Sequence, residues 1–380
     1  MKNNVYCTAP WNGLTIREDG IVRTCCVGTV ELGNLNQDSI FDIEHSPKLI
    51  EIQNLMLLGK PATLNCKDCI NSDQQGGHTL RQYYNRTYTN IDNLKLKFID
   101  IRWNNVCNLA CQYCNSKFSS TWANKLNKVN ARPIKQYQDE LLEWILDRAD
   151  QVTEIMLVGG EPMLMKQNYA LLEKLPIDCR ISIITNLSYN LLTLPCWSNL
   201  LNRPAENIAW NVSLENTGNK FEYVRNGASW DQIKVNFKLL VQHWPNNVSL
   251  NIVYSLFSAF DLVDDIDHYH SLGIKKFNLF NIQQNNAMNV FNMPKVVQTL
   301  AKEQLEKIQT AHWANLHPDD RDFYPLHGID VLINNLGCTD GDTTVTNFNK
   351  QIDFYNKWRD APFESLWPNL VNLVKTYCKP

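Results

Sequence analysis

The sequence predicts an α/β protein whose central part is an open parallel sheet, a partial (β/α)6 TIM-like barrel. Two observations carry this prediction. Six apolar runs rich in β-branched residues recur in the middle of the chain, and amphipathic stretches of helical length lie between most of them. Strands that alternate with helices pair in parallel through right-handed crossovers. Six strands are too few for a closed eight-stranded barrel, so an open one is expected.

The N-terminal part, residues 1–75, is expected to be a small cysteine-rich α+β module. Asp19-Gly20 lies between two apolar runs and predicts a hairpin turn. Apolar positions at helical spacing over Ser39–Leu58 predict a helix that ends at Gly59. The polar stretch that follows, residues 76–94, is expected to connect the module to the barrel.

The barrel is expected over residues 95–290 and a C-terminal helical segment over residues 291–380. The strands are predicted at Leu96–Ile101, Glu154–Val158, Arg180–Thr185, Asn207–Ser213, Asn247–Tyr254 and Lys276–Ile282. The helices between them are predicted at Gln136–Ala149, Lys166–Leu175, Trp230–Trp244 and Leu262–Leu272. Two further helices are predicted at Pro294–His312 and Phe363–Tyr377.

Composition narrows the class of protein. Of 380 residues, 44% are hydrophobic and 20% are charged, as in an ordinary globular protein. The net charge of −3 and the absence of a basic–aromatic stripe argue against nucleic-acid binding. No apolar run reaches membrane-spanning length, and the first residues lack the apolar core of a signal peptide, so we expect a cytoplasmic protein. Twelve cysteines in such a chain favour metal or redox chemistry over disulfides.

Three of these cysteines follow the first predicted barrel strand as Cys107-x3-Cys111-x2-Cys114. Cysteine thiolates are the standard ligands of iron–sulfur clusters, and three of them leave one iron of a cubane open. An open metal position can bind and activate a small molecule. The alternative is a zinc site, which needs a fourth ligand that no nearby Cys or His supplies in sequence.

A glycine-rich turn, Gly159-Gly160-Glu161-Pro162, follows the second predicted strand. Two glycines let the backbone approach a ligand closely, and a carboxylate accepts hydrogen bonds from an ammonium group. Read alone, the turn is also a plausible strand-to-helix connection in which Pro162 starts the helix.

The cysteine loop, with Tyr113 just before its last cysteine, and this turn resemble the signature of the radical S-adenosylmethionine (SAM) superfamily. The resemblance implies a 4Fe-4S cluster on Cys107, Cys111 and Cys114, whose open iron chelates SAM. It also implies that an electron from the cluster cleaves SAM to a 5'-deoxyadenosyl radical, which abstracts hydrogen from a substrate. The SAM contacts that it implies are Tyr113, Gly159, Gly160, Glu161, Pro162, Asn186, Ser213 and Arg225.

The last three of these contacts rest on weaker matches. Asn186 follows the third strand, and Ser213-Leu214-Glu215-Asn216 resembles a Ser-Leu-Asp-Gly pattern of the family, from which Glu215 departs. Arg225 precedes a Gly-containing helix start, and a guanidinium fork suits a carboxylate. The alternative for each of these residues is a turn residue that caps a helix, or a solvated charge.

A second set of thiols lies in the N-terminal module: Cys7, Cys25, Cys66 and Cys69. Four thiolates can close a cubane cluster or hold tetrahedral zinc, and their spacing does not separate the two. With Gly20 before Cys25, the arrangement resembles the twitch module, a half-sized relative of the SPASM extension of radical SAM enzymes. That resemblance implies an auxiliary 4Fe-4S cluster placed before the barrel. Cys26 is an alternative to Cys25.

The resemblance implies an enzyme that uses two 4Fe-4S clusters, SAM and a flavodoxin- or ferredoxin-type electron donor. Enzymes with such modules act mainly on ribosomal peptides and small metabolites, so a peptide or protein side chain is the expected substrate. Four ligands on the auxiliary cluster favour electron transfer and a net oxidation. Ser255 and residues 281–284 are candidate substrate contacts, or simply exposed. The alternatives are a small metabolite or nucleotide as substrate, and a non-enzymatic zinc-binding interaction protein.

Overall fold

The computed structural model describes residues 5–62, 66–74, 79–89, 91–128, 138–282, 287–310 and 326–380. The chain forms two compact units. The first comprises Met1–Asn108, Ser116–Ile184 and Thr193–Ala209, and the second comprises Leu109–Asn115, Thr185–Leu192 and Trp210–Pro380. The division into module, connector, barrel and helical segment stays a prediction.

The sheet of the first unit has the strand order β3-β2-β1-β4-β6-β7. Its strands are β1 (Gly13–Ile16), β2 (Ile21–Arg23), β3 (Gly33–Asn34), β4 (Phe98–Ile101), β6 (Glu154–Leu157) and β7 (Arg180–Thr185). Strands β4, β6 and β7 are parallel neighbours, in agreement with the strands predicted there. All four residues of β4 are buried, as expected for a strand inside a parallel sheet.

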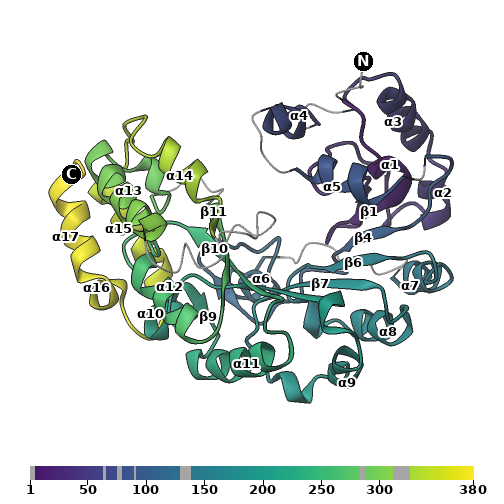
Figure 1. The fold of residues 1–380 in the computed structure, drawn as a ribbon. Coiled ribbons are helices and arrows are strands. Elements are labelled where there is room, and N and C mark those ends of the chain that lie inside the picture. Colours follow the sequence, from purple (N-terminus) through teal and green to yellow (C-terminus); the bar gives the residue numbers. More distant parts are fainter. Residues whose placement is uncertain are drawn as a thin grey trace. The chain divides into compact units, whose positions relative to one another are not determined.

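The predicted N-terminal hairpin extends this sheet (Figure 1). Strand β1 pairs antiparallel with β2, with Ile16 opposite Val22, and the turn contains Gly20 at a φ of 85°. On its other side, β1 pairs in parallel with β4 along all its residues, with Leu14 opposite Ile99. The hairpin is therefore hydrogen-bonded to the first strand of the predicted barrel.

Two helical predictions in this unit differ from the structure. The stretch Ser39–Leu58 holds two helices, because Pro47 lacks the N–H that a continuous helix requires, and the hydroxyl of Ser46 caps the second. The expected connector contains a packed helix over Leu80–Thr87. The helices of the unit are α1 (Ala9–Asn12), α2 (Ile40–Glu44), α3 (Pro47–Leu57), α4 (Cys66–Gln74), α5 (Leu80–Thr87), α6 (Ser120–Lys125), α7 (Gln138–Leu146), α8 (Lys166–Lys174) and α9 (Trp197–Leu201).

The second unit contains a parallel sheet of order β12-β11-β10-β8. Its strands are β8 (Ile208–Ser213), β10 (Val248–Tyr254), β11 (Lys276–Asn281) and β12 (Leu326–His327), and a separate antiparallel pair joins β5 (Ala110–Cys111) to β9 (Arg225–Asn226). The first three strands agree with the predicted ones. The parallel strands and helices of the two units give the chain a mixed α/β fold, in agreement with the predicted partial (β/α)6 barrel.

The helices of the second unit include the predicted C-terminal ones. They are α10 (Gly218–Val224), α11 (Trp230–His243), α12 (Leu262–Ser271), α13 (Lys295–Thr310), α14 (Ile329–Asn335), α15 (Val345–Asn356), α16 (Phe363–Leu366) and α17 (Pro368–Tyr377). The predicted helix Phe363–Tyr377 is broken before Pro368 for the same reason as the break at Pro47. Short 3-10 turns lie at Pro162–Leu164, Leu191–Thr193, Ala205–Asn207 and Val290–Asn292.

An aromatic cluster anchors the C-terminal helices within this unit. Phe363 stacks on Trp367 with ring centroids 4.8 Å apart, and both lie against Phe257 and Tyr223. Phe257 follows β10 and Tyr223 lies on α10, so these helices pack against the strand and helix layer of the sheet.

Among the described residues, the helices include none with the length and apolarity needed to cross a lipid bilayer.

Candidate functional site

The thiols of the N-terminal module line one pocket of the first unit. Cys7, Cys25, Cys66 and Cys69 all border this pocket, and most of its other lining residues are aliphatic. Cys66 and Cys69 lie three residues apart on α4 and so share one helix face. Cys25 faces the pocket, whereas its neighbour Cys26 is exposed. The structure thus brings together all the thiols expected for the auxiliary cluster.

Backbone N–H groups accompany these sulfurs. The N–H of Gly28 donates to Sγ of Cys25 at 3.2 Å. Burial raises the pKa of Cys25 to about 12 and that of Cys7 to about 12, although N–H donors from Gly28 and Ala9 oppose the shift. Burial also raises the pKa of Cys69, opposed by the N–H of Arg81. A metal cluster bound here would displace the thiol protons, and N–H···S bonds are among the factors that set its potential.

Helix α5 closes part of this pocket, although its polar composition suggested a connector. Leu80, Arg81 and Tyr84 line the pocket, and Tyr84 packs in a core cluster with Tyr88 and Phe98. The overlooked signal is the spacing of residues 80, 84 and 88, which places three apolar rings or chains on one helical stripe.

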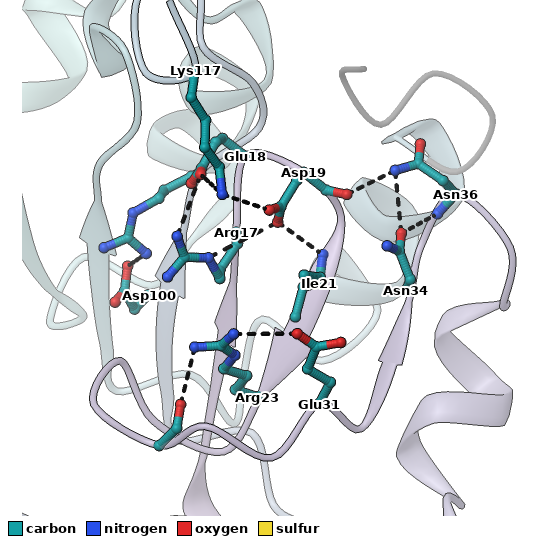
Figure 2. A network of polar contacts seen from close by, with 12 residues as sticks. Arg17, Glu18, Asp19, Ile21, Arg23, Glu31, Asn34, Asn36, Asp100 and Lys117 are labelled. Carbon is teal, nitrogen blue, oxygen red and sulfur yellow. Dashed lines mark hydrogen bonds and ion pairs between the residues drawn. The ribbon is translucent and has the colours of Figure 1, made fainter. Parts of the chain in front are cut away.

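A network of charged and polar side chains lies beside the hairpin of the same unit (Figure 2). Lys117 points toward the carboxylates of Glu18 and Asp19, at 3.8 Å and 3.2 Å. Arg17 also contacts Glu18 at 3.4 Å, so this buried carboxylate has two cationic partners. The network ties the β1–β2 turn to the chain shortly after the cysteine loop.

The same end of the sheet carries a second buried carboxylate. Asp100 lies on β4 and accepts a hydrogen bond from Arg102 at 2.8 Å. Burial raises the pKa of Asp100, and the positive charge of Arg102 opposes the shift.

Cys107 and the glycine turn belong to the first unit, and their backbones are in contact. A Cβ built on Gly160 would overlap the carbonyl group of Val106, and one on Gly159 would lie 3.1 Å from the carbonyl oxygen of Asn104. The N–H of Glu161 donates to the carbonyl of Val106 at 2.8 Å. The glycines are therefore required for the turn to lie against the residues that lead into Cys107.

Glu161 and Pro162 stand at the start of a 3-10 turn. The Glu161 side chain is fully buried and accepts a hydrogen bond from the N–H of Met163 at 3.1 Å. In the structure this carboxylate acts as an N-terminal cap, which is the structural alternative that the sequence left open. Its expected contact with SAM stays a prediction.

Cys111 and Cys114 belong to the second unit. Cys111 lies on β5, opposite Arg225 on β9. Nη1 of Arg225 lies 3.7 Å from Sγ of Cys111. The thiol is buried, which raises its pKa, and the charge of Arg225 opposes the shift. The short β5–β9 pair therefore fixes the segment that carries Cys111 next to a guanidinium.

Arg225 is held by the carboxylate of Glu215, the residue that departs from the family pattern. Its Nε and Nη2 atoms donate to Glu215 at 2.9 Å and 2.8 Å in a bidentate pair, and both side chains are buried. The hydroxyl of Tyr113 donates to the same carboxylate at 2.9 Å, and the guanidinium lies 5.2 Å from the Tyr113 ring centroid. Burial alone would lower the pKa of Arg225, but Glu215 raises it overall, so the arginine stays charged.

This arrangement bears on the expected SAM contacts. Two N–H groups of Arg225 donate hydrogen bonds to Glu215, so the carboxylate of SAM would have to compete with Glu215 for them. Asn186 accepts hydrogen bonds from the backbone and hydroxyl of Ser188, at 3.0 Å and 2.7 Å, as a turn residue does. Ser213 ends β8 as predicted. The SAM-binding roles of these residues stay predictions.

The structure gives no support for Ser255 as a substrate contact and describes only part of residues 281–284. Ser255 is buried, and its hydroxyl accepts from the N–H of Phe257 at 3.3 Å, so it stabilises the loop after β10 instead. Of residues 281–284, Asn281 and Ile282 are described, whereas 283 and 284 lie outside the described residues.

A buried carboxylate lies behind the Glu215 loop. Asp265 on α12 accepts hydrogen bonds from Thr217 at 2.8 Å and Asn216 at 3.2 Å. Burial raises the pKa of Asp265 from 3.8 to about 7. Because the folded state then holds the proton more tightly than the unfolded chain, its contribution to stability is complete below pH 3.8 and declines as pH rises towards 7.

In the described part of the chain, no three His, Cys, Asp or Glu side chains converge closely enough to hold one metal ion as they stand.

Comparisons with known proteins match both segments of the chain that carry the cysteine sets. A model of the radical SAM superfamily matches residues 101–267, and a model of the SPASM iron–sulfur cluster-binding domain matches residues 7–70. The chain belongs to the radical SAM superfamily. It is therefore an enzyme of the radical SAM type, with SAM and a 4Fe-4S cluster as cofactors and further iron–sulfur binding in its SPASM-type module. This assignment removes the alternative of a non-enzymatic zinc-binding protein.

No curated protein matches the sequence. Among solved structures, this radical SAM protein is similar to anSMEcpe with bound AdoMet, at 16% identity and a TM-score of 0.45, over 73% of this chain and 82% of that chain. It is also similar to SuiB of Streptococcus suis bound to S-adenosylmethionine, at 16% identity and a TM-score of 0.40, over 78% of this chain and 68% of that chain.

The described residues fit these cofactors. Four cysteines border one largely aliphatic pocket of the module, which suits a cluster that needs four thiolates. For the radical SAM cluster, Cys107 lies in the first unit and Cys111 and Cys114 in the second, so the ligand set as a whole stays a prediction.

Proposed function

We propose that this radical SAM enzyme oxidises or otherwise modifies a side chain of a peptide or protein, and that the N-terminal pocket holds a fully ligated auxiliary 4Fe-4S cluster. The observation that carries this proposal is that Cys7, Cys25, Cys66 and Cys69 all border one pocket. The peptide class rests on the resemblance to twitch and SPASM enzymes.

Four protein thiolates would leave no iron of the auxiliary cluster open to a substrate. The remaining lining is largely aliphatic and offers few groups that could orient a polar substrate. Among the described residues of the lining, Arg81 is the only ionisable side chain besides the thiols and Tyr84, and it is paired with Asp73. These properties favour a role in electron transfer.

The chain's own residues would orient and shield the reactive centre. The cluster and SAM supply hydrogen abstraction from an unactivated position when both are bound. Gly159 and Gly160 allow the turn after β6 to lie against the residues before Cys107. The Glu215–Arg225 pair holds the guanidinium beside Cys111 without leaving a buried charge unpaired.

A net oxidation balances as follows. The substrate loses one hydrogen atom, which ends in 5'-deoxyadenosine, and the cleaved SAM also yields methionine. The cluster that Cys7, Cys25, Cys66 and Cys69 would hold would supply an acceptor for the second electron of the substrate, and the accompanying proton would pass to solvent. A flavodoxin- or ferredoxin-type protein would supply the electron that each SAM cleavage consumes.

Iron content and SAM cleavage test the two clusters separately. Anaerobically reconstituted wild-type protein should hold about eight irons per chain, the sum of two cubanes. Reduced with dithionite in the presence of SAM, it should form 5'-deoxyadenosine. Cys111→Ala should abolish this product. Formation of 5'-deoxyadenosine by Cys111→Ala at the wild-type rate would overturn the assignment of the cysteine loop.

Adjacent cysteines provide a matched control for the auxiliary site. Cys25→Ser should lower the iron content to about four per chain and leave the SAM-dependent cluster in place. Cys26→Ser, one residue away and exposed, should keep about eight. Equal iron contents in Cys25→Ser and wild type would contradict the four-thiol cluster.

Deuterium transfer tests the substrate class. Cells grown in deuterated medium would provide two extract fractions, one of peptides and proteins and one of small molecules. The abstracted hydrogen ends in 5'-deoxyadenosine, so a mass increase with the peptide fraction supports the proposal. A mass increase only with the small-molecule fraction would support the alternative of a metabolite or nucleotide.

A further inference from the structure

The segment that carries Cys111 is bound on two sides within the second unit. On one side, β5 pairs with β9, and the N–H of Gln112 donates to the carbonyl of Val224 at 3.0 Å. On the other side, two side chains that follow each other closely near the C-terminus donate to carbonyls that flank Cys111. The hydroxyl of Tyr355 donates to Gln112 at 2.7 Å, and Nη2 of Arg359 donates to Ala110 at 3.1 Å.

Arg359 itself is held rigidly. Its Nε donates to the carbonyl of Tyr223 at 2.6 Å, and its guanidinium lies 5.4 Å from the Tyr223 ring centroid and 5.8 Å from that of Tyr355. Tyr355 packs against Phe257 of the aromatic cluster at 6.2 Å between ring centroids. Tyr355 is therefore fixed on the packed helix α15, and Arg359, in the connection between α15 and α16, is fixed by its contacts with Tyr223 and Tyr355.

The two arginines near Cys111 differ in how their charge is balanced. Arg225 is neutralised by the bidentate contact with Glu215. Arg359 donates to backbone carbonyls, and its buried Nη1 has no hydrogen-bond partner among the described residues. No carboxylate in the described ranges forms an ion pair with it. A positive charge in a low-dielectric site stabilises nearby negative charge more than one in water does.

We propose that Tyr355 and Arg359 are positioning residues of the radical SAM site. They fix the backbone on both sides of Cys111, and the unbalanced charge of Arg359 raises the reduction potential of the cluster that Cys111 would bind. This inference rests on the proposed function, since it requires a cluster on the cysteine loop. The physical reason is that one-electron reduction makes the cluster more negative, and nearby positive charge favours the reduced form.

Four variants separate the two parts of this proposal. Arg359→Met removes both the hydrogen bonds and the charge, Arg359→Lys keeps the charge, and Tyr355→Phe removes only the hydroxyl. Lys357→Met removes a positive charge from an exposed position two residues before Arg359 and serves as the control. Cys111 itself stays unchanged in all of them.

The first measurement is the midpoint potential of the cluster whose EPR signal changes when SAM is added. Arg359→Met should lower this potential, while Arg359→Lys, Tyr355→Phe and Lys357→Met should stay close to wild type. The second measurement is hydrogen–deuterium exchange of the peptide over residues 107–116 in cluster-free protein. Exchange should be several-fold faster in Arg359→Met, Arg359→Lys and Tyr355→Phe, and unchanged in Lys357→Met.

The outcomes are distinguishable. A potential in Arg359→Met equal to that of Lys357→Met would overturn the electrostatic part, and wild-type exchange in Tyr355→Phe would overturn the positioning part. If Arg359→Met does not fold, Arg359→Lys and Tyr355→Phe still decide the exchange result. If wild-type protein shows no SAM-responsive cluster, the proposed function fails, whereas the exchange result still tests the contacts.

Discussion

The buried pair of Glu215 and Arg225 gives the most specific prediction for the site. Glu215→Gln would place a neutral amide against a charged guanidinium whose side chain is only 4% exposed. Breaking a buried ion pair typically costs about 3–5 kcal/mol because one charge is left unpaired. The amide oxygen still accepts one of the two hydrogen bonds, so we expect a loss near the lower end, about 3 kcal/mol in the free energy of unfolding.

Urea unfolding of cluster-free protein, followed by tryptophan fluorescence, measures this loss. The control is Asp231→Asn, which neutralises a carboxylate that is 89% exposed and paired with Lys234 at 2.8 Å. Exposed pairs contribute about 1 kcal/mol or less. The double variant Glu215→Gln/Arg225→Met should recover much of the stability, because it removes the unpaired charge as well.

Two results would refute this reasoning. A loss in Glu215→Gln no larger than that of Asp231→Asn would mean that the pair does not hold Arg225 in place. If Glu215→Gln binds SAM more tightly than wild type does, Glu215 keeps Arg225 away from the carboxylate of SAM. Binding that carboxylate is the role that the sequence predicted for Arg225.

Three further predictions concern the turn, a buried acid and the C-terminal helices. Gly160→Ala should lower the iron content of the cysteine loop, because the added Cβ would overlap the carbonyl group of Val106, which precedes Cys107. An iron content equal to that of wild type would contradict the close packing of the glycine turn against the residues before Cys107. In wild type, the rise in the pKa of Asp265 from 3.8 to about 7 should lower the free energy of unfolding by about 4 kcal/mol between pH 4 and pH 7. Asp265→Asn should remove this decline. If urea unfolding shows the same pH slope in the variant as in wild type, other groups cause the slope. Phe363→Ala should lower the free energy of unfolding by about 3–5 kcal/mol, because Phe363 is fully buried among aromatic rings. Phe354→Ala, at a position that is 36% exposed, should lower it much less. Equal losses in urea unfolding would show that the aromatic cluster does not anchor the C-terminal helices.

Much of the fold could be predicted because its signals are local. The strands of the barrel carry apolar, β-branched runs, and the turn at Gly20 has a positive φ that glycine adopts without strain. Errors arose where a short polar segment packs by a few aromatic side chains, as in α5, and where one proline divides a continuous apolar pattern, as at Pro47 and Pro368.

The site was predicted less completely because its contacts join distant parts of the chain. Glu215 looked like a departure from a family pattern, and only the structure places its carboxylate between Tyr113 and Arg225. The contacts of Tyr355 and Arg359 with the cysteine loop span more than two hundred residues, and no local spacing encodes them. The thiols of the module were found because cysteine has few other uses in such a chain.

The pairing of β1 with β4 covers a strand edge that could otherwise promote aggregation. A chain shortened to begin at Lys95 would leave β4 as an outer strand, with the backbone groups of four buried residues open to pairing. An exposed apolar edge strand offers its unpaired backbone groups to other chains, and natural sheets avoid this with very short or covered edge strands. In the intact first unit the sheet ends instead at β3, which has two residues. We therefore expect the N-terminal hairpin to protect β4 from pairing with other chains, independently of any iron that the module binds.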